Sequence, residues 1–327
     1  MTWSITQHRF DPDPALESVF AVANGYLGLR GTPEEGTPAH DAGAILNGFH
    51  ETWPIVYPED AYGLARTGQT IVNATDGSII RLFVDDEPFS PGTAKVHRYE
   101  RELDLRAGVL RREVEWETER GQRLVVRTTR LASFEHRHLA AMSYEVEALD
   151  AGLRIAISSE LVTHGPGETS DDPRRGKGFA EKVLVPIAAL SVGARAVLDL
   201  ETRNSGLELA VGMDHSVSGP VETTAEGDGA RMVVQADLEP GAPLRLDKYV
   251  AYHWTAGAPA GDLVARVERT LDRAARDGYE TIEAQHSAHV AAFWERSDIE
   301  VGGAPEIQRA VRFNLFQLMQ ATARAEG

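Results

Sequence analysis

Short β-strands separated by turns dominate the sequence up to about residue 256, and this pattern constrains the fold most strongly. Residues 113–118 alternate between polar and apolar side chains, and a polar turn containing Gly121 leads to a partner strand at residues 123–131. Further strands are expected at 138–149, 153–161, 182–190, 194–202, 207–215, 230–238 and 244–254. No helical pattern separates these stretches. They therefore predict a mainly β fold, an antiparallel sandwich rather than β-α-β units.

After residue 261, the spacing of the hydrophobic residues changes from that of a strand to that of a helix. Asp262 is expected to cap one helix, which ends near Gly278, and Thr281 is expected to cap a second. The inward stripe of the first helix is Leu263, Val267, Leu271 and Ala274 or Ala275, and that of the second is Ile282, Gln285 or His286, His289 or Val290, and Phe293. Residues 256–261 are rich in chain breakers and predict a domain boundary, whereas residues 164–178 predict a long exposed loop.

A third helix is expected after a Gly-Gly-Ala turn, with Pro305 at its first position. Its residues form two stripes: Ile307, Val311, Leu315, Leu318 and Thr322 on one side, and Ala310, Phe313, Phe316, Met319 or Gln320, and Ala323 on another. A helix that is apolar on two faces belongs inside a larger assembly. We therefore expect the second stripe to lack a cover in this chain, and a second domain to begin here and continue beyond Gly327.

Composition excludes several classes of function. The 327 residues are 42% hydrophobic, which is enough for a large core. A formal charge of −17 argues against nucleic acid or an anionic membrane as a partner. Cysteine is absent, so the chain has neither disulfides nor thiolate metal ligands. The N-terminus does not resemble a signal peptide, and no apolar stretch reaches the roughly 18 residues of a membrane span. These features predict a cytoplasmic protein.

Three motifs favour structural roles over chemical ones. Residues 24–31 (NGYLGLRG) are rich in glycine but match no phosphate-binding pattern, so tight turns or close packing are the preferred interpretation. His136 and His138 are expected to share one face of a strand, a spacing that suits a metal, but no third ligand is apparent. His286 and His289 lie three apart on a helix, and a partly buried helix face explains them. No metal site is predicted.

The chain resembles glycoside hydrolase family 65, which contains maltose, trehalose, kojibiose and nigerose phosphorylases and acid trehalases. Four blocks in order carry the resemblance: residues 17–31, 45–51, 69–73 and 293–320. The last block (FWERSDIEV, followed by IQRAVRFNLFQLMQ) resembles the junction that opens the (α/α)6 barrel of the family. Blocks in the right order and spacing are more specific than any single one.

The resemblance implies three segments. Residues 1–256 would form a large two-sheet super-sandwich of the galactose-mutarotase-like type, residues 257–297 a helical linker, and residues 298–327 the start of the (α/α)6 catalytic domain. In the family, the general-acid glutamate and the phosphate-binding residues belong to the barrel, beyond Gly327. No catalytic residue is therefore assigned in this chain, which we expect to be inactive alone.

The resemblance also implies a reaction. A glutamic acid would protonate the leaving oxygen of an α-glucosidic disaccharide while inorganic phosphate attacks the anomeric carbon from the opposite face. In acid trehalases a base-activated water replaces the phosphate. No cofactor is implied apart from phosphate as co-substrate. The complete enzyme would be a homodimer.

Residues 47–54 (NGFHETWP) are the candidate substrate-binding loop. Aromatic rings stack on sugars, and His or Glu side chains hydrogen-bond hydroxyl groups. In the family, loops of the sandwich approach the mouth of the barrel, which makes Phe49, His50, Glu51 and Trp53 the candidate site residues. The alternative is that Phe49 and Trp53 pack the end of the sandwich and His50 lies at a domain interface.

Two functions from other classes remain open. The chain is also compatible with a stand-alone carbohydrate-binding sandwich whose last helix packs back on the sheet. It is equally compatible with an aldose-mutarotase-like enzyme, because that fold is a super-sandwich too and uses His and Glu for proton transfer. Titration with a disaccharide tests the first alternative, and optical rotation of fresh glucose tests the second.

Overall fold

The computed structural model describes residues 3–36, 43–57, 61–164, 182–257, 259 and 261–324. The predicted loop at 164–178 therefore lies almost entirely outside the described residues. The helices are α1 (Pro14–Val19), α2 (Asp262–Asp277), α3 (Tyr279–Ser297) and α4 (Pro305–Ala321). The strands are β1 (Ser4–Gln7), β2 (Val22–Ala23), β3 (Leu27–Leu29), β4 (Ala44–Pro54), β5 (Thr67–Ala74), β6 (Ile80–Val84), β7 (Glu87–Pro88), β8 (Lys95–Asp104), β9 (Val109–Glu117), β10 (Arg123–Ala132), β11 (Leu139–Ala148), β12 (Leu153–Val162), β13 (Leu184–Val192), β14 (Arg195–Thr202), β15 (Glu208–Val217), β16 (Val221–Glu226), β17 (Gly229–Leu238) and β18 (Leu244–Thr255).

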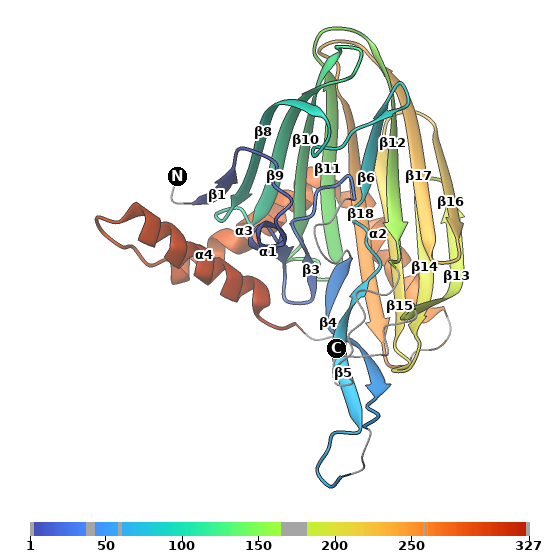
Figure 1. Ribbon diagram of the computed structural model, residues 1–327. Coiled ribbons are helices and arrows are strands. Elements are labelled where there is room, and N and C mark those ends of the chain that lie inside the picture. The colour runs from blue at the N-terminus through green and yellow to red at the C-terminus, as the bar shows by residue number, and fades with distance from the viewer. Residues whose placement is uncertain are drawn as a thin grey trace.

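Two large antiparallel sheets form the body of the molecule (Figure 1). Within the described residues, nine strands pair in the order β1-β8-β9-β10-β11-β18-β15-β14-β13, and five pair in the order β16-β17-β12-β6-β7. A smaller sheet, β2-β3-β4-β5, lies at one end. The predicted β-sandwich is confirmed.

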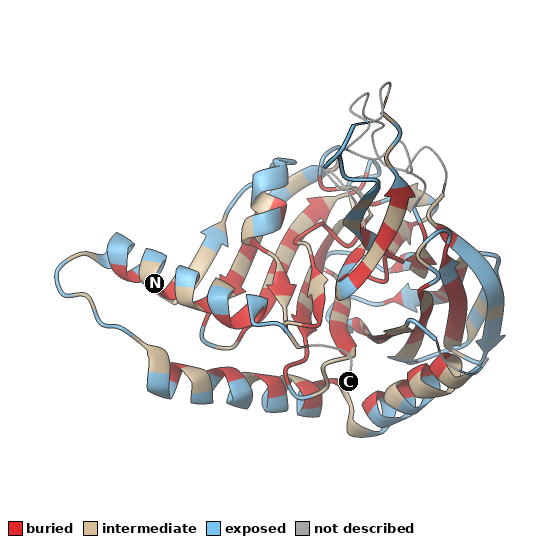
Figure 2. Ribbon diagram, turned by 90° about the horizontal axis from the view of Figure 1, so that it is seen from below, coloured by how far each residue is buried: buried red, intermediate tan, exposed pale blue. Residues whose placement is uncertain are grey.

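Alternation along the strands explains why the sheets pack. In β9, Val114 and Trp116 point into the core and are fully buried, while Glu113 and Glu115 occupy the opposite face. The outward carboxylates pair with arginines of β10: Glu113, for example, lies 3.0 Å from Arg127 Nε. Figure 2 shows the resulting layers, with buried residues along the strands and exposed residues on the outer surfaces of the helices.

A buried ionic cluster lies inside the sandwich, and the sequence analysis did not predict it. Arg112 forms two hydrogen bonds of 2.7 Å to Glu35 and lies 2.8 Å from Glu34. Arg130 pairs with Glu34 and donates to the carbonyl oxygens of Arg30 and Thr32. Burial alone would raise the pKa of Glu34, but the charges of Arg112 and Arg130 outweigh it and lower the pKa to about 2.

Helices α2 and α3 cover the other face of the nine-stranded sheet. Leu263, Val267 and Leu271 of α2 and Ile282 of α3 are fully buried against strand residues such as Tyr249. The predicted stripe of α2 is confirmed, and Ile282, His286 and Val290 of the predicted α3 stripe are buried, but Phe293 is only half-buried and Trp294 is buried instead. The predicted caps are wrong. Asp262 is the first helical residue and follows Gly261, and α3 begins at Tyr279 after Gly278, so Thr281 lies inside the helix. Both glycines adopt positive φ, which lets the chain turn sharply without a side-chain cap.

Helix α4 begins at Pro305, as predicted, but packs with a different face. Phe316 is 1% and Met319 9% exposed, whereas Ile307 is 53% and Leu318 67% exposed. The expectation that the Phe316–Met319 stripe lacks a cover is therefore wrong, and the other stripe is the one left largely open. The buried face also holds polar residues, because Arg312 pairs with Asp298 and Gln308 bonds the backbone of Ile299 and Val301.

No helix among the described residues is both long and apolar enough to cross a lipid bilayer. The boundaries proposed at residues 256 and 297 stay predictions. The structure adds that the last strand, β18, ends at Thr255 and that α2 begins at Asp262.

Candidate functional site

Three of the four sequence blocks that carry the family resemblance meet in the small sheet. Residues 17–31 supply β2 and β3, residues 45–51 lie in β4, and residues 69–73 lie in β5. β3 pairs with β4, and β4 pairs with β5. The β4–β5 hairpin extends beyond the two large sheets (Figure 1), which makes it the candidate functional site.

The candidate stretch 47–54 is a strand rather than the predicted loop. It belongs to β4, whose side chains alternate between buried and more exposed positions. The pairing with β5 shifts register between Ile45 and His50, and Gly48 adopts a φ of +81° within this bulge. The bulge places Phe49, Glu51 and Trp53 on the inner face and His50 on the outer face.

The two aromatic residues pack along the inner face of the hairpin, and Trp53 lies near its loop end, opposite Gly68. Phe49 is fully buried, and its ring centroid lies 5.9 Å from that of Trp254 in β18. Trp53 is 6% exposed and packs against Gly68, where a Cβ would overlap the indole. These contacts agree with the packing alternative for Phe49 and Trp53.

Glu51 ties the hairpin to the β14–β15 turn. Its Oε1 accepts hydrogen bonds from the backbone N–H groups of Thr52 and Ser205, both at 2.7 Å, and its Oε2 accepts one from Asn204 at 3.0 Å. The side chain of Asn204 donates in turn to the carbonyl oxygen of Thr52. A buried carboxylate with three backbone donors holds the strand in place.

The outer face of the hairpin carries uncharged polar groups beside an apolar one. His50 lies opposite Ile71, and Thr52 lies opposite Gln69. His50 Nδ1 is 2.8 Å from the carbonyl oxygen of Gly48, so Nδ1 donates this hydrogen bond, and in the neutral ring Nε2 is then an acceptor. Ile71 is 58% exposed. A mixture of neutral hydrogen-bonding groups and apolar surface suits a sugar.

The glycine-rich block forms a turn that receives the end of α4. Asn24 Oδ1 accepts the N–H groups of Tyr26 and Leu27, which closes the β2–β3 turn at Gly25. Gly25 has a φ of +81°, and a Cβ there would overlap the carbonyl oxygen of Thr322. Gln320 Oε1 accepts the N–H of Ala23 at 2.6 Å. The block therefore serves a tight turn and close packing, as the sequence analysis preferred.

The paired histidines have structural partners. His136 and His138 lie in a turn before β11, so the predicted strand geometry is wrong. His138 stacks on His253 with ring centroids 3.9 Å apart. His286 Nε2 donates to the carbonyl oxygen of Gly108 at 2.9 Å, and burial lowers its pKa to about 4. Across the described ranges, no group of three or more His, Asp or Glu side chains is arranged to hold a metal.

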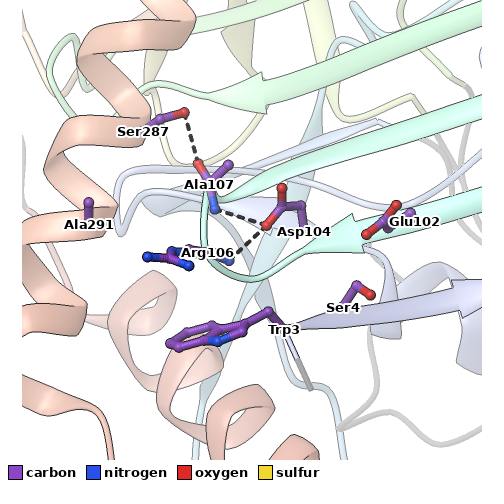
Figure 3. Close-up of a pocket in the computed structure, with 8 residues that line it drawn as sticks. All are labelled: Trp3, Ser4, Glu102, Asp104, Arg106, Ala107, Ser287 and Ala291. Atoms are coloured by element: carbon purple, nitrogen blue, oxygen red, sulfur yellow. Dashed lines mark hydrogen bonds between the residues drawn. The ribbon is translucent and has the colours of Figure 1, made fainter. Parts of the chain in front are cut away.

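A concavity of about 480 Å³ lies between β1, the β8–β9 turn and α3 (Figure 3). Asp104 shapes this turn by accepting the N–H groups of Arg106 and Ala107. Trp3 lines the pocket, but Arg106 and Arg312 already lie over its ring, 5.7 and 3.7 Å from the centroid. The indole is therefore not an open platform for a sugar. The sequence analysis missed this pocket because its residues come from three distant segments without a shared motif.

Comparison with known proteins agrees with this arrangement. An uncharacterized glycosyl hydrolase of Mycobacterium leprae is 41% identical over 99% of this chain and 42% of its own length. The α,α-trehalose phosphorylase of Thermoanaerobacter brockii is 33% identical over 98% of this chain and 42% of its own length. The chain thus spans less than half the length of these relatives.

A solved structure from the human microbiome, provisionally described as a kojibiose phosphorylase, shares the fold. It superposes with a TM-score of 0.88 at 19% identity, over 98% of this chain and 42% of its own. The family model described as the N-terminal domain of glycosyl hydrolase family 65 matches residues 5–293. The chain therefore belongs to glycosyl hydrolase family 65, of which it contains the N-terminal domain.

Proposed function

We propose that this chain is the N-terminal portion of an enzyme that cleaves an α-glucosidic disaccharide with inversion, using inorganic phosphate as acceptor. Family membership supports the reaction class, and the 33% identity to an α,α-trehalose phosphorylase makes trehalose the first substrate to test. In this reaction phosphate takes the position that an activated water has in inverting hydrolases. Fold and family constrain chemistry less than a site does, so the substrate needs a direct assay.

The observation that carries the proposal is the outer face of the β4–β5 hairpin. We assign the substrate contact to His50, whose Nε2 is an acceptor for a sugar hydroxyl. Phe49, Glu51 and Trp53 act by holding the strand, since all three are buried on its inner face. The same small sheet receives the end of α4 through the Gln320–Ala23 hydrogen bond. A catalytic domain that continues from α4 would therefore start beside the hairpin.

Two preparations test the reaction. The full-length gene product and this 327-residue chain are each incubated with trehalose, maltose or kojibiose and phosphate. We expect the full-length protein to form β-glucose 1-phosphate and this chain to form none. Release of glucose at the same rate without phosphate would contradict phosphorolysis and indicate a hydrolase. Turnover by this chain alone would contradict the assignment of catalysis to another domain.

We also propose that the enzyme forms a homodimer through the β13 edge. β13 ends the nine-stranded sheet, and its nine residues (LVPIAALSV) carry no charge in a chain that is 25% charged. Val185, Ile187, Leu190 and Val192 are 38–80% exposed. Pro186 and the adjacent bulge interrupt the start of β13, so the edge available for pairing is residues 187–192, which is apolar and uncharged. Apolar edges without charged residues invite pairing with another strand. An antiparallel edge is self-complementary about a two-fold axis, so a second copy is the partner that fits.

A cytoplasmic location completes the proposal. A chain without cysteine needs no oxidising compartment to fold. Fractionation of cells that express the full-length protein tests this point, and recovery outside the cytoplasm would contradict it.

A further inference from the structure

A pocket of about 340 Å³ lies between the turn before β11, helix α2 and the residues that follow α4. Its lining includes the guanidinium groups of Arg137, Arg273 and Arg324 and a single carboxylate, that of Glu135. The whole chain carries a formal charge of −17. Three arginines around one cavity therefore give this region a sign of charge opposite to the net charge of the molecule. We call these four residues, with His138 and Thr270, the arginine pocket.

Protein acceptors hold two of the three arginines. Arg324 Nη1 donates to the carbonyl oxygen of Phe134 at 2.7 Å, and its backbone N–H donates to Gly25 at 2.9 Å. Arg137 Nε donates to His138 Nε2 at 3.0 Å. A guanidinium has five N–H donors, so one anchoring bond leaves Arg324 able to bind a second acceptor. The negative charge of Glu135 acts on Arg324, and the positive charge of Arg137 acts against it.

Together with burial, this positive charge lowers the pKa of the neighbouring histidines. Burial, followed by the charges of Arg137, Arg266 and Arg324, lowers the pKa of His138 to about 4. Burial and nearby positive charges, including those of Arg266 and Arg269, lower the pKa of His253 to about 3. Both imidazoles are therefore neutral at pH 7. The potential in this region comes from arginine and does not depend on histidine protonation.

The geometry points to a binding site for a tetrahedral oxyanion of the phosphate class, as inorganic phosphate or as the phosphate group of a small phosphomonoester. Arginine binds phosphate with paired N–H donors, and guanidiniums of like charge are stabilised when an anion bridges them. The volume falls in the range of small-molecule sites. A bound anion would link the turn before β11, α2 and the end of α4. This site differs from the acceptor site of the proposed reaction, which is expected on barrel residues.

Calorimetric titration of this chain with inorganic phosphate tests the site, at pH 7.5 and constant ionic strength set by chloride. We expect saturable binding to one site. Arg273→Gln and Arg324→Gln should each weaken it by about tenfold, the loss typical of one charged hydrogen bond. Arg276→Gln is the matched control, because Arg276 lies on the same helix but pairs with Asp277 outside the pocket. Arg273 is exposed, so its replacement should leave the circular dichroism spectrum unchanged.

A second experiment measures whether glucose 6-phosphate or glucose displaces bound phosphate. Displacement of phosphate by glucose 6-phosphate, but not by glucose, would show that the site accepts a monoester, whereas binding of phosphate alone would show that it takes the free ion. The absence of saturable binding for both phosphates overturns the inference. So does an equal loss in Arg276→Gln, since that result would reflect net charge only. Because the readout is binding to this chain, it stands apart from any test of turnover.

Discussion

The guanidinium of Arg312 lies over the indole of Trp3, with its central carbon 3.7 Å from the ring centroid. The same guanidinium forms hydrogen bonds of 2.8 and 2.7 Å to the two carboxylate oxygens of Asp298. Trp294 meets Trp3 edge-on at 5.0 Å. One cluster thus joins the first strand of the sandwich, the end of α3 and the middle of α4. It determines how α4 sits on the sandwich.

Replacing Trp3 should weaken the packing of α4 against the sandwich. Trp3→Ala removes a cation–π contact and a partly buried ring, and we expect the free energy of unfolding to fall by about 2 kcal/mol. Urea denaturation followed by tryptophan fluorescence and by circular dichroism measures the loss. Arg106→Gln is the control, because Arg106 lies farther from the ring, at 5.7 Å. An equal loss in both variants would contradict a specific role for the Arg312–Trp3 contact.

The turn at Gly25 should tolerate no side chain. Gly25→Ala introduces strain at a φ of +81° and a clash with the carbonyl oxygen of Thr322. Gly63 has a similar φ of +87° but nothing within 4 Å of its Cβ position, so Gly63→Ala reports the strain alone. We expect Gly25→Ala to cost about 1–3 kcal/mol more than Gly63→Ala in thermal unfolding, the usual cost of overpacking. Equal costs would mean that the end of α4 does not dock on this turn.

The buried ionic cluster should make stability depend on acidic pH. The charges of Arg112 and Arg130, acting against burial, lower the pKa of Glu34 from its ordinary 4.5 to about 2. A lowered folded-state pKa contributes stability that is complete above about pH 4.5 and is lost as the pH falls towards about 2. Urea midpoints measured between pH 7 and 2.5 should therefore separate the wild type from Glu34→Gln most strongly above pH 4.5. A pH-independent difference would contradict the shift.

Replacing Arg112, a cation of the same cluster, should lower the free energy of unfolding more than replacing Glu34. Arg112→Met leaves the carboxylates of Glu34 and Glu35 buried, with Arg130 paired to Glu34 and the charge of Arg101 also acting on Glu34. Breaking a buried pair from one side costs roughly 3–5 kcal/mol. Arg154→Met is the control, since its ion pair with Asp237 is exposed and should contribute less than about 1 kcal/mol. Similar losses for the two variants in urea denaturation would argue against the cluster.

The hairpin assignment predicts a kinetic effect of His50. In the full-length protein, His50→Ala should raise KM or lower kcat by about tenfold, the value of one hydrogen bond to a sugar hydroxyl. His97→Ala is the control, because His97 lies on β8 and pairs with Glu117. Unchanged kinetics in His50→Ala would remove His50 from the substrate site.

The edge strand predicts the oligomeric state. Val192→Lys places a charge on the β13 edge and should weaken dimerisation by about 2 kcal/mol or more, since a lysine in an edge strand opposes pairing. Light scattering coupled to gel filtration measures the change. Val56→Lys is the control, because Val56 is also largely exposed, at 75%, but lies beyond the end of β4. A monomeric wild type, or a dimer that survives Val192→Lys, would reject the β13 interface.

Local sequence patterns predicted the strands best where alternation was strong. The hairpin β9–β10 lies where the alternation of residues 113–118 and 123–131 placed it. The predicted strands began at residue 113, so they did not include β1–β8. They also omitted β16, whose residues are all partly or fully exposed, so its hydrophobic signal is weak. The caps of α2 and α3 were misplaced by one and three residues, because glycines with positive φ start these helices where side-chain caps were expected.

For the candidate site, too, the sequence identified the residues but not how their side chains are oriented. The sequence identified residues 47–54 as chemically distinctive, and its family blocks identified the neighbouring segments. It did not show that a bulge turns His50 outward and Glu51 inward, because register depends on the partner strand. Similarly, His136 and His138 have strand-like spacing in the sequence but lie in a turn.

By itself, the sequence determined the class of fold, the family, most strands after residue 113 and the three helices after residue 261, since periodicity and short motifs are local properties of the chain. Only the tertiary structure decided which face of α4 is buried, that Arg112 and Glu35 pair inside the sandwich, and that Arg137, Arg273 and Arg324 surround one pocket. These residues are far apart in the sequence. Their energies depend on burial and on distance in space, which exist only once the sheets and helices have packed.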